Sequence, residues 1–409
     1  MYFYWSRVLR SCRNQRYLFF TRPRRREMSN DNDKTITVDT KYDLYRLENG
    51  PLEKATINEK EAMYALKTMI YIRRMENKAA ELYRLRLING FLHLYSGQEA
   101  VAVGMKMSMK EHDSLITAYR CHGFAVVFGV SAREVFAELM GRKTGVSRGK
   151  GGSMHMYAKQ FYGGDGIVGG QVPIGAGLGF AEKYNGTGGV AWTLYGDGAA
   201  SQGQVHETYN ISQLWNLPVV YICENNQYGM GTAVHRHSAN TKFYTRGDLI
   251  PGVKVDGMRV ADVCEAIKFA RDHAVRRGPI ILEMVTYRYF GHSMSDPGTS
   301  YRTRDEVKSV RDERDPIKLF IQVLVENGLK TSAEIQVSSR RDTTARSRGL
   351  IESRLYILVK QIQDSVNKVV DEELEQAKAD PPPEMSEIAA NVYVKPLEKI
   401  RGKVPWEVH

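Results

Sequence analysis

Three apolar runs of strand length, separated by segments of helical length, constrain how this chain of 409 residues can fold. The runs are residues 190–195 (VAWTLY), 219–224 (VVYICE) and 280–289 (IILEMVTYRY), with helices predicted at 202–216 and 261–277 between them. This order of strands and helices predicts a parallel sheet with helices on both faces. We therefore expect an α/β fold whose ligand-binding groups follow the carboxyl ends of the strands.

A carboxylate and an amide follow two consecutive strands where such ligands are expected. Asp197 lies in GDG after the first run, and Asn226 lies in ENN after the second. Because a crossover helix joins the two strands, their carboxyl ends are expected to lie close together. Carboxylate and amide oxygens suit Mg²⁺, which completes its coordination with phosphate oxygens and water. The alternative for GDG alone is an ordinary tight turn, but the pair favours a magnesium site that anchors a phosphate-bearing cofactor.

GDG followed by NN, one helix and one strand later, matches the signature of thiamine diphosphate enzymes, and longer motifs extend the likeness over residues 55–330 and 363–390. These motifs are HLYSGQEAVAVG, ITAYRCHG, RGKGGSMHMYAKQFYGGDGIVGGQVPIGAG, LYGDGAASQGQ, ICENNQYGMGT and TYRYFGHSMSDPGTSYRTRDE. In them the chain resembles the alpha subunits of mitochondrial pyruvate dehydrogenases, thiamine-diphosphate-dependent members of the 2-oxo acid dehydrogenase family. The resemblance implies the thiamine diphosphate-binding fold. The alternative is the alpha subunit of another 2-oxo acid dehydrogenase or of an acetoin dehydrogenase.

The resemblance also implies site residues, motif by motif. Asp197, Asn226 and the backbone carbonyl of Tyr228 would hold Mg²⁺. The residues expected to contact thiamine diphosphate are Tyr119, Arg120, Ala158, Gly166, Val168, Asp197, Gly198, Ala199, Asn226, Tyr228 and His292. His93 and His292 are expected to be catalytic, since histidine can donate to a carboxylate or a developing oxyanion and can transfer protons near neutral pH.

The implied reaction is the oxidative decarboxylation of pyruvate, with transfer of the acetyl group to a lipoyl group on a dihydrolipoamide acetyltransferase. In this family a glutamate of the beta subunit acts on the aminopyrimidine ring of the cofactor, and no matching glutamate motif is found in this sequence. The chain is therefore expected to supply half of an active site in an α2β2 heterotetramer and to be inactive alone.

Residues 290–304 (FGHSMSDPGTSYRTR) resemble a regulatory loop, in which Ser293 and Ser300 match positions that a pyruvate dehydrogenase kinase and phosphatase modify and restore. A phosphate on Ser293 would add about two negative charges beside a site built for anions, so inactivation is expected.

Three positions depart from the family pattern. Phe290 stands where animal enzymes usually have histidine, which removes a hydrogen-bonding contact. Ala233 replaces a serine that is phosphorylated in relatives, so regulation by phosphorylation at this position is expected to be absent. Asp165 replaces the asparagine of GGNG and brings an extra carboxylate near the diphosphate, which predicts weaker cofactor affinity or a greater magnesium requirement.

Residues 1–28 resemble a mitochondrial transit peptide, with eight arginines and no acid in the first 26 positions, and imply the mitochondrial matrix; a true start at Met28 is the alternative. These arginines supply most of the net charge of +11, so nucleic acid is not expected as a partner. No apolar stretch comes near the length needed to span a bilayer, so a membrane is not expected either. Four scattered cysteines suit a reducing compartment. The expected organisation is a leader (1–28), a dehydrogenase domain (29–335), a mobile insertion, either genuine or a translated intron (336–362), and a C-terminal helix and tail (363–409).

Overall fold

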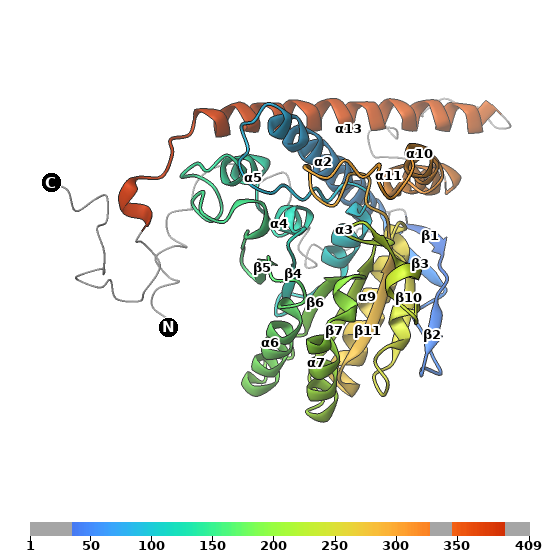
Figure 1. The fold of residues 1–409 in the computed structure, drawn as a ribbon. Helices are drawn as coiled ribbons and strands as arrows, with labels where there is room; N and C mark the ends of the chain where they lie inside the picture. The colour runs from blue at the N-terminus through green and yellow to red at the C-terminus, as the bar shows by residue number, and fades with distance from the viewer. Residues whose placement is uncertain (1–34, 328–345, 389–409) are drawn as a thin grey trace.

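The computed structural model describes residues 35–327 and 346–388, and the expected leader lies outside them. At its centre is a seven-stranded sheet with the order β2-β10-β11-β7-β6-β4-β5 (Figure 1). The first strand, Asp43–Tyr45 (β2), is antiparallel to β10, and the other neighbours are parallel. The parallel strands are Gly252–Asp256 (β10), Ile280–Val285 (β11), Val219–Asn225 (β7), Ala191–Gly196 (β6), Ser114–Ala118 (β4) and Phe161–Asp165 (β5).

Helices cover both faces of this sheet, as predicted. Helices Gln171–Asn185 (α6) and Gly203–Leu214 (α7) pack with Tyr195 of β6, while Glu99–Ser108 (α3) and Val260–Arg277 (α9) pack on the face that carries Trp192. Successive side chains of one strand point to opposite faces, so β6 contributes to both layers. Helix α6 lies so close to β6 that a Cβ on Gly175 would sit 1.9 Å from Thr193 Oγ1. The expected α/β fold is confirmed.

The predicted helix at 58–88 is observed as Glu59–Arg84 (α2), which begins with a capping box between Asn58 and Glu61. It ends four residues early because Arg86 adopts a left-handed conformation with φ 58°. The capping box predicted for Ser131 is confirmed at the start of Ala132–Leu139 (α5).

One long helix, Arg346–Ala379 (α13), lies along α2 and α5 (Figure 1). The insertion itself stays a prediction, while the boundary expected at 362 falls within this continuous helix. Its buried apolar side chains follow helical spacing on both sides of that boundary, at Val359, Val366 and Val370. The Ser/Arg-rich start of the segment obscured this pattern in the sequence, and residues 336–345 lie outside the described part. The helix ends just before the three prolines at 381–383, as predicted.

None of the helices in the described ranges is both long and apolar enough to cross a bilayer.

The remaining elements connect these layers. The elements are Thr35–Asp39 (β1), Lys54–Asn58 (β3), His122–Val127 (α4), Gly152–Met154 (η1), Ala199–Ser201 (η2), Tyr228–Gly229 (β8), Thr232–Ala233 (β9), Val234–His237 (α8), Phe243–Thr245 (η3), Arg304–Glu313 (α10), Pro316–Glu326 (α11) and Met385–Ile388 (η4).

Candidate active site

Except for Ala158, the predicted cofactor residues follow the carboxyl ends of five neighbouring parallel strands, where ligands of open α/β sheets bind. Ala158 precedes β5, and His93 lies between α2 and α3. The others, grouped by strand, are Gly166 and Val168 (β5), Tyr119 and Arg120 (β4), Asp197, Gly198 and Ala199 (β6), Asn226 and Tyr228 (β7), and His292 (β11).

The predicted magnesium ligands come from two segments that touch each other. A Cβ on Gly198 would lie 3.0 Å from the Cα of Gly229, so the turn after β6 packs directly on the segment after β7. Asp197 and Asn226 are buried, with 1% and 9% of their surfaces exposed. Across the described residues, no cluster of three or more His, Cys, Asp or Glu forms a metal site. A cation here would therefore rely on one carboxylate with amide and carbonyl oxygens, a donor set that suits Mg²⁺.

Two side chains orient these oxygens, and sequence reasoning missed both. The amide nitrogen of Asn226 donates to Oε1 of Gln98 at 3.1 Å, which leaves the amide oxygen as the atom for a cation. His237 Nε2 lies 3.3 Å from Oδ2 of Asp197, and the Ser238 hydroxyl is 2.8 Å from the other ring nitrogen. Gln98 lies in the motif HLYSGQEAVAVG, so the sequence held a sign that it belongs to the site. His237 lies in none of the family motifs, so nothing in the sequence pointed to it.

The carbonyl of Tyr228 already has one partner, because Nη1 of Arg288 donates to it at 3.3 Å. A carbonyl oxygen has two lone pairs, so a second remains for a metal. Arg288 is 1% exposed and also donates to Met230 O at 2.8 Å, which fixes the tight segment after β7.

The two predicted catalytic histidines lie together with Tyr119. The ring of His93 is 4.7 Å from that of Tyr119 and 5.3 Å from that of His292, between centroids. The Tyr119 hydroxyl lies 2.9 Å from Nε2 of His292. Within the described residues, the buried Nδ1 of His93 has no hydrogen-bond partner. A buried polar atom without a partner is costly, and a ligand placed here could satisfy it.

Burial and nearby arginines keep both histidines neutral. Burial, reinforced by the charge of Arg120, lowers the pKa of His93 to about 2. Burial, with Arg120 and Arg288 adding to it, lowers the pKa of His292 to about 4. Each ring therefore offers one donor and one acceptor at neutral pH.

Arg120 joins the segments that carry these histidines. Its guanidinium donates to Leu94 O at 2.7 Å and to His292 O at 2.8 Å. Burial and the charge of Arg288 lower its pKa to about 10, so it is still a cation at neutral pH.

The glycine-dense segment borders the site at the edge of the sheet. Ala158 packs against the core and Val168 is 44% exposed. Asp165, at the end of β5, accepts the backbone N–H of Ile167 at 2.8 Å and so closes the turn that leads to Gly166.

The two predicted phosphorylation sites differ in access. Ser300 is exposed, whereas Ser293 is 7% exposed and its hydroxyl is 2.8 Å from that of Ser295. Asp296 holds the loop by accepting the backbone N–H groups of His292 and Gly298 at 2.7 and 2.8 Å. Phe290 takes part in lining a cavity of about 540 Å³ beside this loop.

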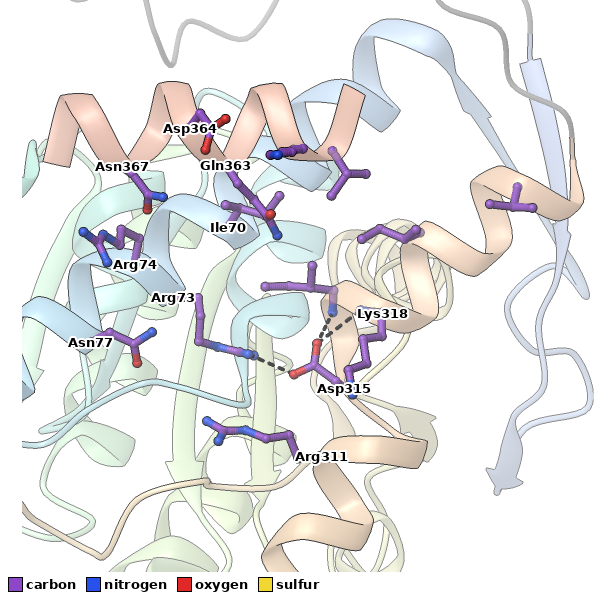
Figure 2. A pocket seen from close by; sticks show the side chains of 15 residues that line it. Ile70, Arg73, Arg74, Asn77, Arg311, Asp315, Lys318, Gln363, Asp364 and Asn367 are labelled. Atoms are coloured by element: carbon purple, nitrogen blue, oxygen red, sulfur yellow. Dashed lines mark hydrogen bonds and ion pairs between the residues drawn. The ribbon is translucent and has the colours of Figure 1, made fainter. Parts of the chain in front are cut away.

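A cavity of about 870 Å³ between α2, α11 and α13 is separate from the site, since none of the predicted site residues lines it. Figure 2 shows its ion pair between Arg73 and Asp315, at 2.9 Å. Arg73 also pairs with Glu99 at the start of α3, and Asp315 accepts the Tyr289 hydroxyl at 3.0 Å. This network secures the segment after β11 that leads to His292.

Known proteins resemble this chain over most of its length. A family model described as "Dehydrogenase E1 component" matches residues 67–346. The chain is 47% identical over 377 residues to the pyruvate dehydrogenase E1 component subunit alpha, somatic form, mitochondrial, of Homo sapiens, which covers 92% of this chain and 90% of that protein. It is 48% identical over 372 residues to the mitochondrial E1 alpha subunit of Saccharomyces cerevisiae, with 90% and 83% covered. The probable Caenorhabditis elegans subunit is 49% identical over 363 residues, with 88% and 85% covered. The chain therefore belongs to the dehydrogenase E1 component family.

Proposed function

We propose that this chain is the alpha subunit of a pyruvate dehydrogenase E1 component, which decarboxylates pyruvate oxidatively and passes the acetyl group to a lipoyl acceptor. The observation that carries the proposal is the gathering of Asp197, Asn226, Arg120 and His292 beyond neighbouring strand ends. The names of the relatives favour pyruvate over another 2-oxo acid or acetoin as substrate.

The residues present fit thiamine diphosphate and Mg²⁺. The Gly198–Gly229 contact holds Asp197 and the segment from Asn226 to Tyr228 side by side, which supports a cation bound between them. Backbone N–H groups at Gly198 and Ala199, with Tyr119 and Arg120 opposite, would contact the diphosphate. Gly166 and Val168 would lie along the cofactor, with Ala158. When bound, the cofactor supplies the electron sink for decarboxylation.

The histidines of this chain would orient pyruvate. Neutral His93 can donate to or accept from the substrate through Nδ1, which has no hydrogen-bond partner in the part of the chain that the structure describes. His292, whose Nε2 meets the Tyr119 hydroxyl, can hold a proton on its other nitrogen. The positive charge of Arg120 lies close enough to lower both histidine pKa values, and it favours an anionic substrate.

The proposal includes a beta subunit that completes the active site in an α2β2 assembly. An exposed aromatic cluster on α6 and at the residue that follows α7 supports such a partner. Phe180 stacks on Tyr184 and contacts Trp215, at centroid distances of 6.0 and 5.9 Å, and all three are about half or more exposed. Exposed apolar clusters of this kind mark interaction surfaces. A lipoyl-bearing dihydrolipoamide acetyltransferase would receive the acetyl group.

Regulation by a kinase and a phosphatase is part of the proposal. Ser300 is accessible as the loop stands, but Ser293 must leave its contact with Ser295 before a kinase can reach it. A phosphate there would displace the loop that carries His292. We place the protein in the mitochondrial matrix, as the names of the relatives suggest.

The test is co-expression with a beta subunit, followed by assay of pyruvate-dependent carbon dioxide release with and without thiamine diphosphate and Mg²⁺. Release that needs both subunits and both cofactors is expected, and Asp197→Ala should abolish it. A preference for a branched-chain 2-oxo acid or acetoin would favour the alternative substrates. Release by the alpha chain alone would contradict the shared active site.

A further inference from the structure

A buried hydrogen-bond network lies next to the histidine cluster, and none of its side chains is among the predicted site residues. Nδ1 of His122 donates to the two carboxylate oxygens of Glu76 at 3.1 and 3.0 Å, and Nε2 is 2.9 Å from the Ser153 hydroxyl. Glu76 and His122 are 0% exposed and Ser153 is 4% exposed. Because the three residues come from α2, α4 and η1, the network joins three separate elements.

The chemistry of the groups sets the direction of each hydrogen bond. A carboxylate can only accept, so Nδ1 of His122 carries the proton. With a single ring proton, on Nδ1, Nε2 accepts and the Ser153 hydroxyl donates to it. This leaves Oγ of Ser153 free to accept the backbone N–H of His93, which lies 3.1 Å away. Each donor in the network has an acceptor.

The order of serine, histidine and carboxylate resembles that of a nucleophilic triad. The contacts of Ser153 argue against that role here, because its Oγ accepts the backbone N–H of His93 at 3.1 Å and so serves as a structural acceptor.

We propose that Glu76, His122 and Ser153 are positioning residues for His93, an inference that rests on the proposed function. Oε1 of Glu76 also accepts the backbone N–H of Tyr95 at 2.8 Å. The same carboxylate therefore fixes the irregular segment before α3 at two points, directly at residue 95 and through His122 and Ser153 at residue 93. Among residues 35–327 and 346–388, Nδ1 of His93 has no hydrogen-bond partner, so the placement of this ring depends on how firmly its backbone is held.

The experiment compares Ser153→Ala with wild type in the co-expressed complex. We expect the kcat for pyruvate to fall at least tenfold, while the affinity for thiamine diphosphate, measured by calorimetric titration, changes less than twofold. Ser153→Cys, which keeps a donor and acceptor of similar size, should recover at least threefold of that loss. The matched control is Ser108→Ala, which removes another buried serine hydrogen bond, to Cys264 O at 3.0 Å, away from the site; its kcat should equal that of wild type.

Amide hydrogen exchange of residues 91–97 gives a readout independent of activity. Faster exchange in Ser153→Ala than in Ser108→Ala is expected, because the His93 N–H loses its acceptor. Unchanged exchange together with an unchanged kcat would overturn the positioning role. If the wild-type complex released no carbon dioxide from pyruvate, the proposed function would fail, and the exchange comparison would still decide whether the network holds His93.

Discussion

Gly198→Ala tests whether the turn after β6 and the segment after β7 form one cofactor site. The added Cβ would sit 3.0 Å from the Cα of Gly229, inside the usual carbon contact of about 3.5–4.0 Å. Gly198 has φ −65°, which alanine adopts without strain, so the cost comes from this contact. Because the Cβ meets backbone, the two segments must move apart. Overpacking of this kind costs about 1–3 kcal/mol.

If the moved segments are those that bind Mg²⁺, this energy appears as lost affinity. A cost of about 1–3 kcal/mol corresponds to roughly 5- to 150-fold weaker binding. The assay is a Mg²⁺ titration of the co-expressed complex at saturating thiamine diphosphate, followed by circular dichroism. Gly203→Ala is the control, since a Cβ there would meet nothing within 4 Å, and it should change the affinity less than twofold. Wild-type Mg²⁺ affinity in Gly198→Ala would refute the site.

Three further predictions concern the rest of the site. In Arg120→Lys one ammonium replaces a guanidinium that donates to both Leu94 O and His292 O, so kcat/KM for pyruvate should fall at least tenfold, as expected for a lost charged hydrogen bond of about 1.5–3 kcal/mol. The pKa of His292 is lowered to about 4 from an unfolded value of about 6.5. The contribution of this residue to stability is therefore present above pH 6.5 and is lost as the pH falls toward 4. Between pH 7 and pH 5, the melting temperature of the complex should fall less for His292→Asn than for wild type. Asp165→Asn keeps the acceptor for the Ile167 N–H but removes a negative charge, so calorimetric titration should show up to about fivefold tighter binding of thiamine diphosphate; an unchanged affinity would contradict the expected repulsion.

The sequence predicted the parallel sheet and the strand ends because these depend on local patterns. Strands β6, β7 and β11 each show a short apolar run followed by turn residues, and the capping box of Ser131 lies within four residues of sequence. Topology then places groups that follow parallel strands at one edge of the sheet, so the order of strands and helices was enough to pair Asp197 with Asn226. The motifs of the family supplied the remaining site residues.

The partners that orient the site could not be predicted in the same way. Gln98 and Asn226 are 128 residues apart, and Glu76 and His122 are 46 apart, so no local pattern links them. The start of α13 was missed because a local pattern was misleading. Its Ser/Arg-rich beginning suggested an irregular segment, whereas the apolar side chains that follow are spaced as in a helix. Which polar group meets which is decided by the packing of separate elements.

Three buried arginines around the site lack a carboxylate partner among the described residues, and this bears on the charge of the ligands that the site would bind. Arg120, Arg288 and Arg302 are 6%, 1% and 6% exposed, and within residues 35–327 and 346–388 none of them forms an ion pair. They donate mainly to backbone carbonyls, such as those of Leu94, Tyr228 and Arg288 itself. Buried positive charge without a carboxylate partner is costly. The charges of Arg120 and Arg288 add to burial in lowering the pKa values of His93 and His292, which keeps both rings neutral. An anionic cofactor and an anionic substrate would offset that cost by placing negative charge beside the three arginines. A phosphoryl group on the adjacent loop would also bring negative charge to these arginines, and so would compete with the cofactor and the substrate for them.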